Sequence, residues 1–100
     1  MKYDLRFPNV SIEKKFREVL ARLPLDIRDR VMEAIEKLAD QPHPYGSTDS
    51  LKLKPPVAIY QYVAQYRLRI GDYRVLYDVD TRRKIVWVLA LRRRNEQTYK

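Results

Sequence analysis

The sequence of 100 residues contains no cysteine, one histidine and only two glycines. Without cysteine there are no disulfides and no thiolate chemistry, and the isolated His43 cannot build a metal site by itself. We therefore expect no metal ion and no cofactor. No apolar run is long enough to span a membrane and no N-terminal hydrophobic signal segment is present. The sequence thus predicts a cytoplasmic protein that does not associate with membranes.

The excess of positive charge is the main feature of the composition. There are 21 Lys and Arg residues against 13 Asp and Glu, which gives a formal net charge of +8. A charge of this size indicates a polyanionic partner, either nucleic acid or a strongly acidic protein, because an acidic small molecule would not need it. With 45% hydrophobic residues the chain can bury one modest core. We predict a single domain over residues 1–100.

The first forty residues predict a strand followed by two helices. Residues 1–9 alternate Tyr3, Leu5 and Phe7 with polar residues and stop at Pro8-Asn9, which is typical of a short strand. Ser11 is a candidate N-cap for a helix that ends at Pro24, and a second helix closes before Pro42. The apolar stripes of these helices are Ile12, Phe16, Val19, Leu20 and Leu23, and then Ile27, Val31, Ala34, Ile35 and Leu38. The short link between them predicts an antiparallel helical hairpin.

The second half of the chain predicts an irregular loop and a meander of strands. Residues 41–56 contain four prolines and a glycine, which favours a loop. Strand-like runs follow at about 58–70, 73–79 and 84–91. The order of an N-terminal strand, a helical hairpin and a three-stranded antiparallel meander predicts an α+β fold, with a helical layer on an antiparallel sheet.

The segment RLRIGDYR, residues 67–74, predicts a tight hairpin with unusual charge. A two-residue loop that begins with Gly71 suits a type II′ turn, which pairs Arg69 with Arg74 and leaves Arg67 on the same face. Like charges directly opposite each other in a sheet are destabilising. We therefore expect an anion at this face: a carboxylate of this chain, an acidic partner protein, or phosphate.

The composition of this face favours an external anion. Asp78 is the nearest carboxylate on these strands, and one carboxylate cannot neutralise three guanidinium groups. Arginine at all three positions also favours bidentate recognition of phosphate or carboxylate. A solvated face with ordinary surface ion pairs is the alternative.

Further basic residues extend the candidate site. If the second hairpin has a four-residue loop that pairs Val79 with Lys84, then Arg93 falls on the arginine face, and a one-residue change in that loop would reverse this. The other candidates for contact with nucleic acid are Arg67, Arg92, Arg94, Lys52, Lys54, Arg82, Arg83 and Lys84. For the lysines and the turn residues, simple solvation is the alternative, and for Tyr99 it is a frayed terminus.

The run YRLRIGDYRVLYDVD, followed by KIVWVLAL, a basic cluster and Tyr99, resembles the RelE/ParE superfamily of toxins from type II toxin–antitoxin modules, and specifically its RelE branch. The helical hairpin and the LKLK segment fit the same pattern, so the resemblance covers nearly the whole chain. It implies a RelE-like fold and a ribosome-dependent endoribonuclease that cleaves mRNA in the ribosomal A site without a metal ion. It also implies an acidic cognate antitoxin, bound in a higher-order hetero-oligomer.

The resemblance also assigns site residues. The basic-x-basic strand element falls on Arg67 and Arg69, and the turn arginine on Arg74. The post-strand arginine matches Arg93 best, with Arg92 and Arg94 as substitutes, and the terminal tyrosine matches Tyr99. The implied catalytic residues are Arg69, Arg74, Arg93 and Tyr99. Fixed guanidinium groups would stabilise the charge that develops when a 2′-hydroxyl attacks the adjacent phosphate. Tyr99 would act as the general base or stack on a nucleotide base.

Two other functions stay open from the sequence. A toxin of the ParE branch, which inhibits DNA gyrase, shares the fold but does not keep this set of arginines and tyrosine. A noncatalytic basic module that binds RNA or an acidic protein would be supported by the net charge alone.

Overall fold

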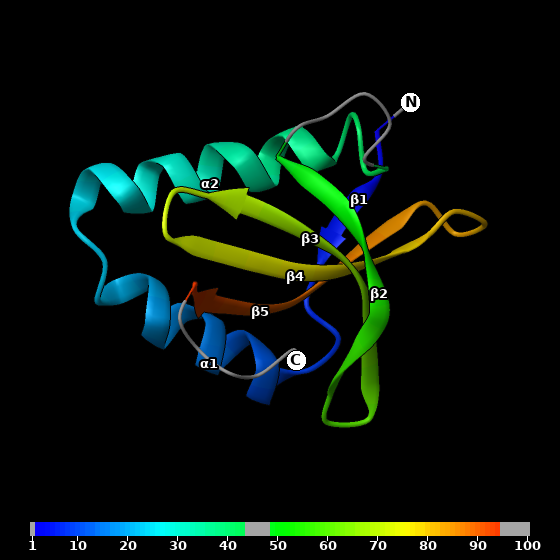
Figure 1. Cartoon of the computed structure of the whole chain (residues 1–100). Coiled ribbons are helices and arrows are strands. Elements are labelled where there is room, and N and C mark those ends of the chain that lie inside the picture. The colour runs from blue at the N-terminus through cyan, green and yellow to red at the C-terminus, as the bar shows by residue number, and fades with distance from the viewer. Residues whose placement is uncertain (1, 44–48, 95–100) are drawn as a thin grey trace.

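The computed structural model describes residues 2–43 and 49–94, and Figure 1 shows their arrangement. The elements are β1 (Asp4–Arg6), α1 (Val10–Ala21), α2 (Leu25–Leu38), β2 (Ser50–Ile59), β3 (Tyr62–Ile70), β4 (Tyr73–Asp80) and β5 (Ile85–Arg93). They form one sheet of order β1-β5-β4-β3-β2, in which β1 runs parallel to β5 and the other pairs are antiparallel. The predicted α+β class and element order are confirmed, with one strand more than predicted.

The additional strand is β2, which occupies much of the segment predicted to be an irregular loop. Pro55 and Pro56 argue against a strand, but β2 lies at the edge of the sheet, where proline is tolerated. The pairing with β3 is interrupted between Lys52 and Val57, where the prolines fall. The turn from β2 to β3 contains no glycine, and Tyr60 adopts a positive φ of 57° there. The sequence therefore carries no signal that divides this run into two strands.

Capping interactions fix the ends of the helices. The side chain of Asn9 accepts a hydrogen bond from the backbone N–H of Ile12 at 2.9 Å, so Asn9 is the N-cap of α1. The predicted N-cap, Ser11, is wrong by two residues and lies inside the helix. At the other end of α1, Arg28 of α2 donates to the carbonyl oxygen of Ala21 at 3.2 Å. Neither helix in the described part of the chain is long and apolar enough to cross a membrane.

The main core lies between the helices and the sheet. Its buried residues are Phe16, Leu23, Val31, Ile35 and Leu38 from the helical half, and Leu68, Ile70, Val75, Tyr77, Val86, Val88 and Leu91 from the sheet. A second cluster forms around the β2–β3 hairpin and consists of Ile12, Leu53, Val57, Ile59, Ala64, Leu76 and Leu89. The middle of β4 is therefore buried on both faces.

One buried hydroxyl group ties the segment after α2 to the sheet. Tyr77 is fully buried, and its hydroxyl group donates to the carbonyl oxygen of Pro42 at 3.1 Å. Burial raises the pKa of Tyr77 to about 12. The ring also stacks on Tyr66, with 5.5 Å between the ring centroids. This contact holds the chain where it leaves α2 against the middle of β4.

Candidate functional site

Three arginines lie side by side at the same end of three adjacent strands. Arg69 of β3 pairs with Arg74 of β4, and Arg74 pairs with Arg92 of β5. Adjacent strands are about 4.8 Å apart, so this arginine row, Arg69, Arg74 and Arg92, spans about 10 Å. Arg67 lies two residues before Arg69 on β3 and extends the row along the same face. The predicted pairing of Arg69 with Arg74 is confirmed.

The β3–β4 turn anchors the central arginine of the row. Gly71 has a φ of 57°, the left-handed conformation that the predicted tight turn needs at its first position. Arg74 is only 7% exposed, and its Nη1 atom donates to the carbonyl oxygens of Gly71 and Tyr73, both at 2.9 Å. The backbone N–H of Arg94 donates to the carbonyl oxygen of Asp72 at 2.6 Å, which ties the end of β5 to the same turn. The guanidinium group of Arg74 is therefore held in a fixed position.

The second hairpin has the predicted loop length in a different register. The four-residue loop joins Asp80 to Ile85, so the predicted pairing of Val79 with Lys84 is wrong. Lys84 instead belongs to the turn, with a φ of 59°. The change moves the pairing by two residues, and by itself it does not alter which side chains share a face.

A β-bulge at Leu89 reverses the orientation of the last residues of β5. The register shifts there by one residue, because β5 carries one residue more than β4 across the irregularity. A register shift of one residue moves every following side chain to the other face of the sheet. Arg92 consequently lies opposite Arg74, while Arg93 pairs with Tyr73. The prediction that Arg93 lies on the arginine face is wrong, and Arg92 takes that place.

Asp78 is not the counter-ion of the row. It lies four residues from Arg74, about 13 Å along β4, and it pairs with Trp87 of β5. Burial raises the pKa of its carboxyl group, whereas a nearby guanidinium group would favour the charged form and lower it. Within residues 2–43 and 49–94, neither Arg69 nor Arg74 forms an ion pair. The row thus presents positive charge that Asp78 does not balance.

The basic turn between β4 and β5 lies at the opposite end of the sheet from the arginine row (Figure 1). Its residues are Arg82, Arg83 and Lys84. Asp80, which precedes this turn, is already about 20 Å from Arg74 along the strand. The Nζ atom of Lys84 lies 5.3 Å from the ring centroid of Tyr3. The structure therefore separates these three candidates from the row.

The remaining candidates take different positions. Lys52 and Lys54 are exposed on the edge strand β2 rather than in a loop. Lys52 pairs with Tyr66, so it lies on the face opposite to that of Arg67. Arg94 is exposed directly after β5. Tyr99 lies outside the described residues.

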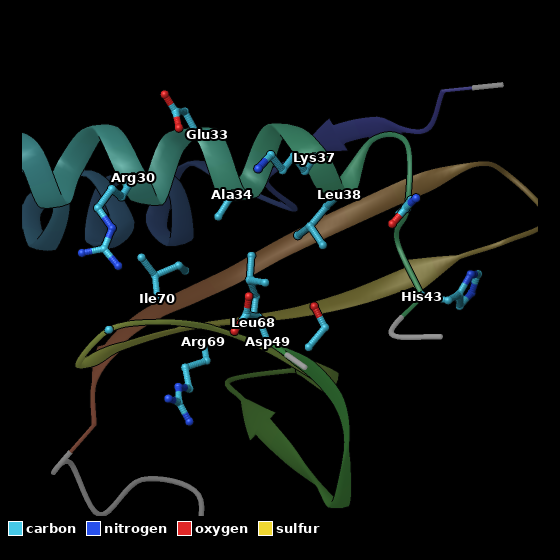
Figure 2. A pocket seen from close by; sticks show the side chains of 13 residues that line it. Arg30, Glu33, Ala34, Lys37, Leu38, His43, Asp49, Leu68, Arg69 and Ile70 are labelled. Carbon is cyan, nitrogen blue, oxygen red and sulfur yellow. The ribbon is translucent and has the colours of Figure 1, made fainter. Parts of the chain in front are cut away.

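A groove adjoins the row, and it contains cationic residues that were absent from the predicted site. It has a volume of about 500 Å³ and lies between α2 and the C-terminal end of β3 (Figure 2). Arg30 and Lys37 of α2 line it together with Arg69. Their spacing of seven residues, or two helical turns, is the only sequence signal that places both on one face of the helix. The described residues contain no group of three His, Cys, Asp or Glu side chains that could hold a metal ion.

Known proteins share this fold. The family described as "ParE toxin of type II toxin-antitoxin system, parDE" matches residues 10–98. The chain is similar to one from the crystal structure of the archaeal RelE-RelB complex from Pyrococcus horikoshii, with 29% identity, a TM-score of 0.71, and coverage of 96% of this chain and 99% of that chain.

Two further solved structures are similar. A chain of the toxin–antitoxin complex RelBE2 from Mycobacterium tuberculosis has 25% identity and a TM-score of 0.65, over 94% of this chain and 100% of that chain. A double arginine mutant of the E. coli toxin RelE in the free state has 19% identity and a TM-score of 0.55, over 95% of this chain and 86% of that chain, and this likeness shows the fold alone. None of the curated protein sequences matches the chain.

Proposed function

Because the chain belongs to the ParE toxin family of type II toxin–antitoxin systems, within the RelE/ParE superfamily, we propose that it is an endoribonuclease that cleaves mRNA in the ribosomal A site. The observation that carries this proposal is the arginine row, in which Arg69, Arg74 and Arg92 lie on three adjacent strands. The two similar chains with identities of 25% and 29% come from RelE-RelB complexes, which favours the RelE type of activity over the ParE type.

The row fits the chemistry of RNA cleavage. When a 2′-hydroxyl oxygen attacks the adjacent phosphorus, the P–O5′ bond breaks, and extra negative charge develops on the nonbridging oxygens in between. Guanidinium groups match phosphate oxygens with two parallel hydrogen bonds. Arg74 is already fixed by its bonds to the turn, so little reorganisation is needed to stabilise this charge. In this proposal the arginines supply the positive charge that a metal ion supplies in other nucleases.

We assign separate roles to the remaining predicted residues. Arg92 takes the phosphate contact that the sequence had favoured for Arg93, since Arg92 lies opposite Arg74. Arginine is almost always protonated and is a poor proton donor or acceptor. Proton transfer must therefore come from another group, and Tyr99 is the proposed general base or nucleotide-stacking residue.

The proposed inhibitor is an acidic cognate antitoxin that covers the arginine row. A surface with a net charge of +8 attracts an oppositely charged chain, and a disordered antitoxin can fold as it binds. Charge reversal at Arg69, with the fold intact, is expected to weaken binding of the antitoxin to the purified chain. Binding is the readout because the proposed toxicity itself depends on Arg69, and unchanged binding would indicate that the antitoxin acts at another surface.

The test of the activity is primer extension on a reporter mRNA in a purified translation system, with and without ribosomes. We expect ribosome-dependent cleavage by the wild type, and a loss of about 10²- to 10³-fold in rate for Arg74→Ala, because one preorganised donor to the transition state is removed. Tyr99→Phe tests the proposed general base. Arg22→Ala, which removes an exposed arginine just after α1, is the matched control and should cleave like the wild type.

A folded wild type that does not cleave mRNA would overturn this proposal. The family match to ParE toxins then favours the second candidate function, inhibition of DNA gyrase. A gyrase supercoiling assay with the same preparation separates the two, because an endoribonuclease leaves supercoiling unchanged.

A further inference from the structure

We propose that the groove between α2 and β3 is a second phosphate-binding subsite, which holds the RNA strand where it leaves the arginine row, with Arg30 and Lys37 as its cationic side chains. The inference rests on the proposed function, because it extends the path of the same substrate. The volume of about 500 Å³ lies in the range of sites that bind one small molecule, a size that suits a nucleotide.

The groove and the arginine row lie on opposite faces of the sheet and meet at the end of β3, because Leu68 and Ile70, on either side of Arg69, pack against the helices. Figure 2 shows Arg30 pointing from α2 toward the β3–β4 turn. Its Nη2 atom lies 4.0 Å from the position that a Cβ atom would take on Gly71, the residue whose carbonyl oxygen anchors Arg74. Arg69 belongs both to the row and to the lining of the groove. Lys37 lies two turns further along α2, about 10 Å from Arg30. Both cations lie on the helical side of the sheet, so an RNA strand that reaches them from the row has to pass around the end of β3 at Arg69.

The two cations on α2 form no ion pair within the described part of the chain. Neither Arg30 nor Lys37 forms an ion pair or a side-chain hydrogen bond with another described residue. Two carboxylates also line the groove, those of Glu33 and Asp49. Figure 2 shows Glu33 pointing away from the strands, so its carboxylate lies outside the space between helix and sheet. An external anion is therefore the expected partner of Arg30 and Lys37.

The floor of the groove favours RNA over a protein segment. A helix or strand of a partner protein binds through exposed apolar anchors, which are matched by apolar side chains on the receiving surface. The large apolar residues that line this groove are Leu38, Leu68 and Ile70, which are only 3–6% exposed. Cationic walls above a buried floor fit the phosphate backbone of a single strand better than an amphipathic helix.

The experiment measures binding of two single-stranded oligoribonucleotides with 2′-O-methyl groups, which cannot be cleaved, to the purified full-length chain. One has about three nucleotides and occupies the arginine row, and the other has about eight and reaches the groove. For Arg30→Ala/Lys37→Ala we expect about tenfold weaker binding of the longer probe and unchanged binding of the shorter one. The negative slope of log K, where K is the binding constant, against log[salt] should become shallower by about 1.4, because each lost phosphate contact removes about 0.7 for a single strand. The matched control is Lys14→Ala/Arg22→Ala, which removes the same charge from exposed positions at and after α1.

Each outcome decides the inference. A loss confined to the longer probe and to the groove variant supports it. Equal behaviour of the groove and control variants overturns the subsite, while cleavage of mRNA by the wild type in the same preparation leaves the proposed function standing. If the groove variant binds RNA normally but loses binding of an acidic antitoxin, the groove is a protein-docking surface and the inference is wrong. A wild type that neither cleaves mRNA nor binds the longer probe overturns the proposed function and the subsite together.

Discussion

At the scale of single residues, ionisation of Tyr77 is expected to destabilise the folded chain at alkaline pH. Its pKa of about 12 in the folded state lies above the ordinary value of about 10, so its contribution to stability is complete below about pH 10 and is lost as the pH rises through 12. We expect Tyr77→Phe to lower the free energy of unfolding at pH 7 by about 1–3 kcal/mol, because the carbonyl oxygen of Pro42 loses its buried donor. Urea unfolding at pH 7 and 11 measures both effects, with Tyr60→Phe, at an exposed tyrosine, as the control. If Tyr77→Phe lost stability above pH 10 as steeply as the wild type, Tyr77 would not be the titrating group.

At the scale of elements, the bulge in β5 decides which arginine lies in the arginine row. Arg92 lies opposite Arg74, whereas Arg93 faces the other side of the sheet. Under the proposed function, Arg92→Ala should reduce the rate of mRNA cleavage about 10²-fold, as expected for the loss of one transition-state donor, and Arg93→Ala should reduce it less than about tenfold. The two variants carry the same change in charge at adjacent positions, so each is the control for the other in the primer-extension assay. A larger defect in Arg93→Ala would contradict the assigned orientation.

At the scale of the whole molecule, the net charge of +8 works against the compact state. Salt screens this repulsion. A rise from about 20 to about 300 mM NaCl, without RNA, should stabilise the chain by about 1 kcal/mol, or about 4–8 °C in Tm for a domain of this size. In the variant Lys14→Glu/Arg22→Glu, two charge reversals lower the formal net charge from +8 to +4. Its Tm should rise less with salt, as measured in a thermal melt followed by circular dichroism. Equal rises in the two proteins would mean that global repulsion is not the cause.

The sequence by itself determined the features that depend on neighbours in the chain. The period-two pattern and the glycine around residue 71 predict the β3–β4 hairpin, and with it the pairing of Arg69 and Arg74. The apolar stripes predict both helices and their core residues, because helical periodicity is a local property. The excess of positive charge and the resemblance to the RelE/ParE toxins likewise needed no coordinates.

The tertiary structure alone decided the features that depend on contacts between distant segments. Strand β2 tolerates its prolines because it lies at the edge of the sheet, and this position cannot be seen from residues 50–59. The bulge at Leu89 arises from the pairing of β5 with β4, and it moves Arg92 rather than Arg93 into the row. Arg30 approaches Gly71 because the core holds α2 against β3. Strand register and the packing of helix on sheet are set by many contacts between residues far apart in the sequence. The local sequence around a residue therefore does not reveal where these contacts place it.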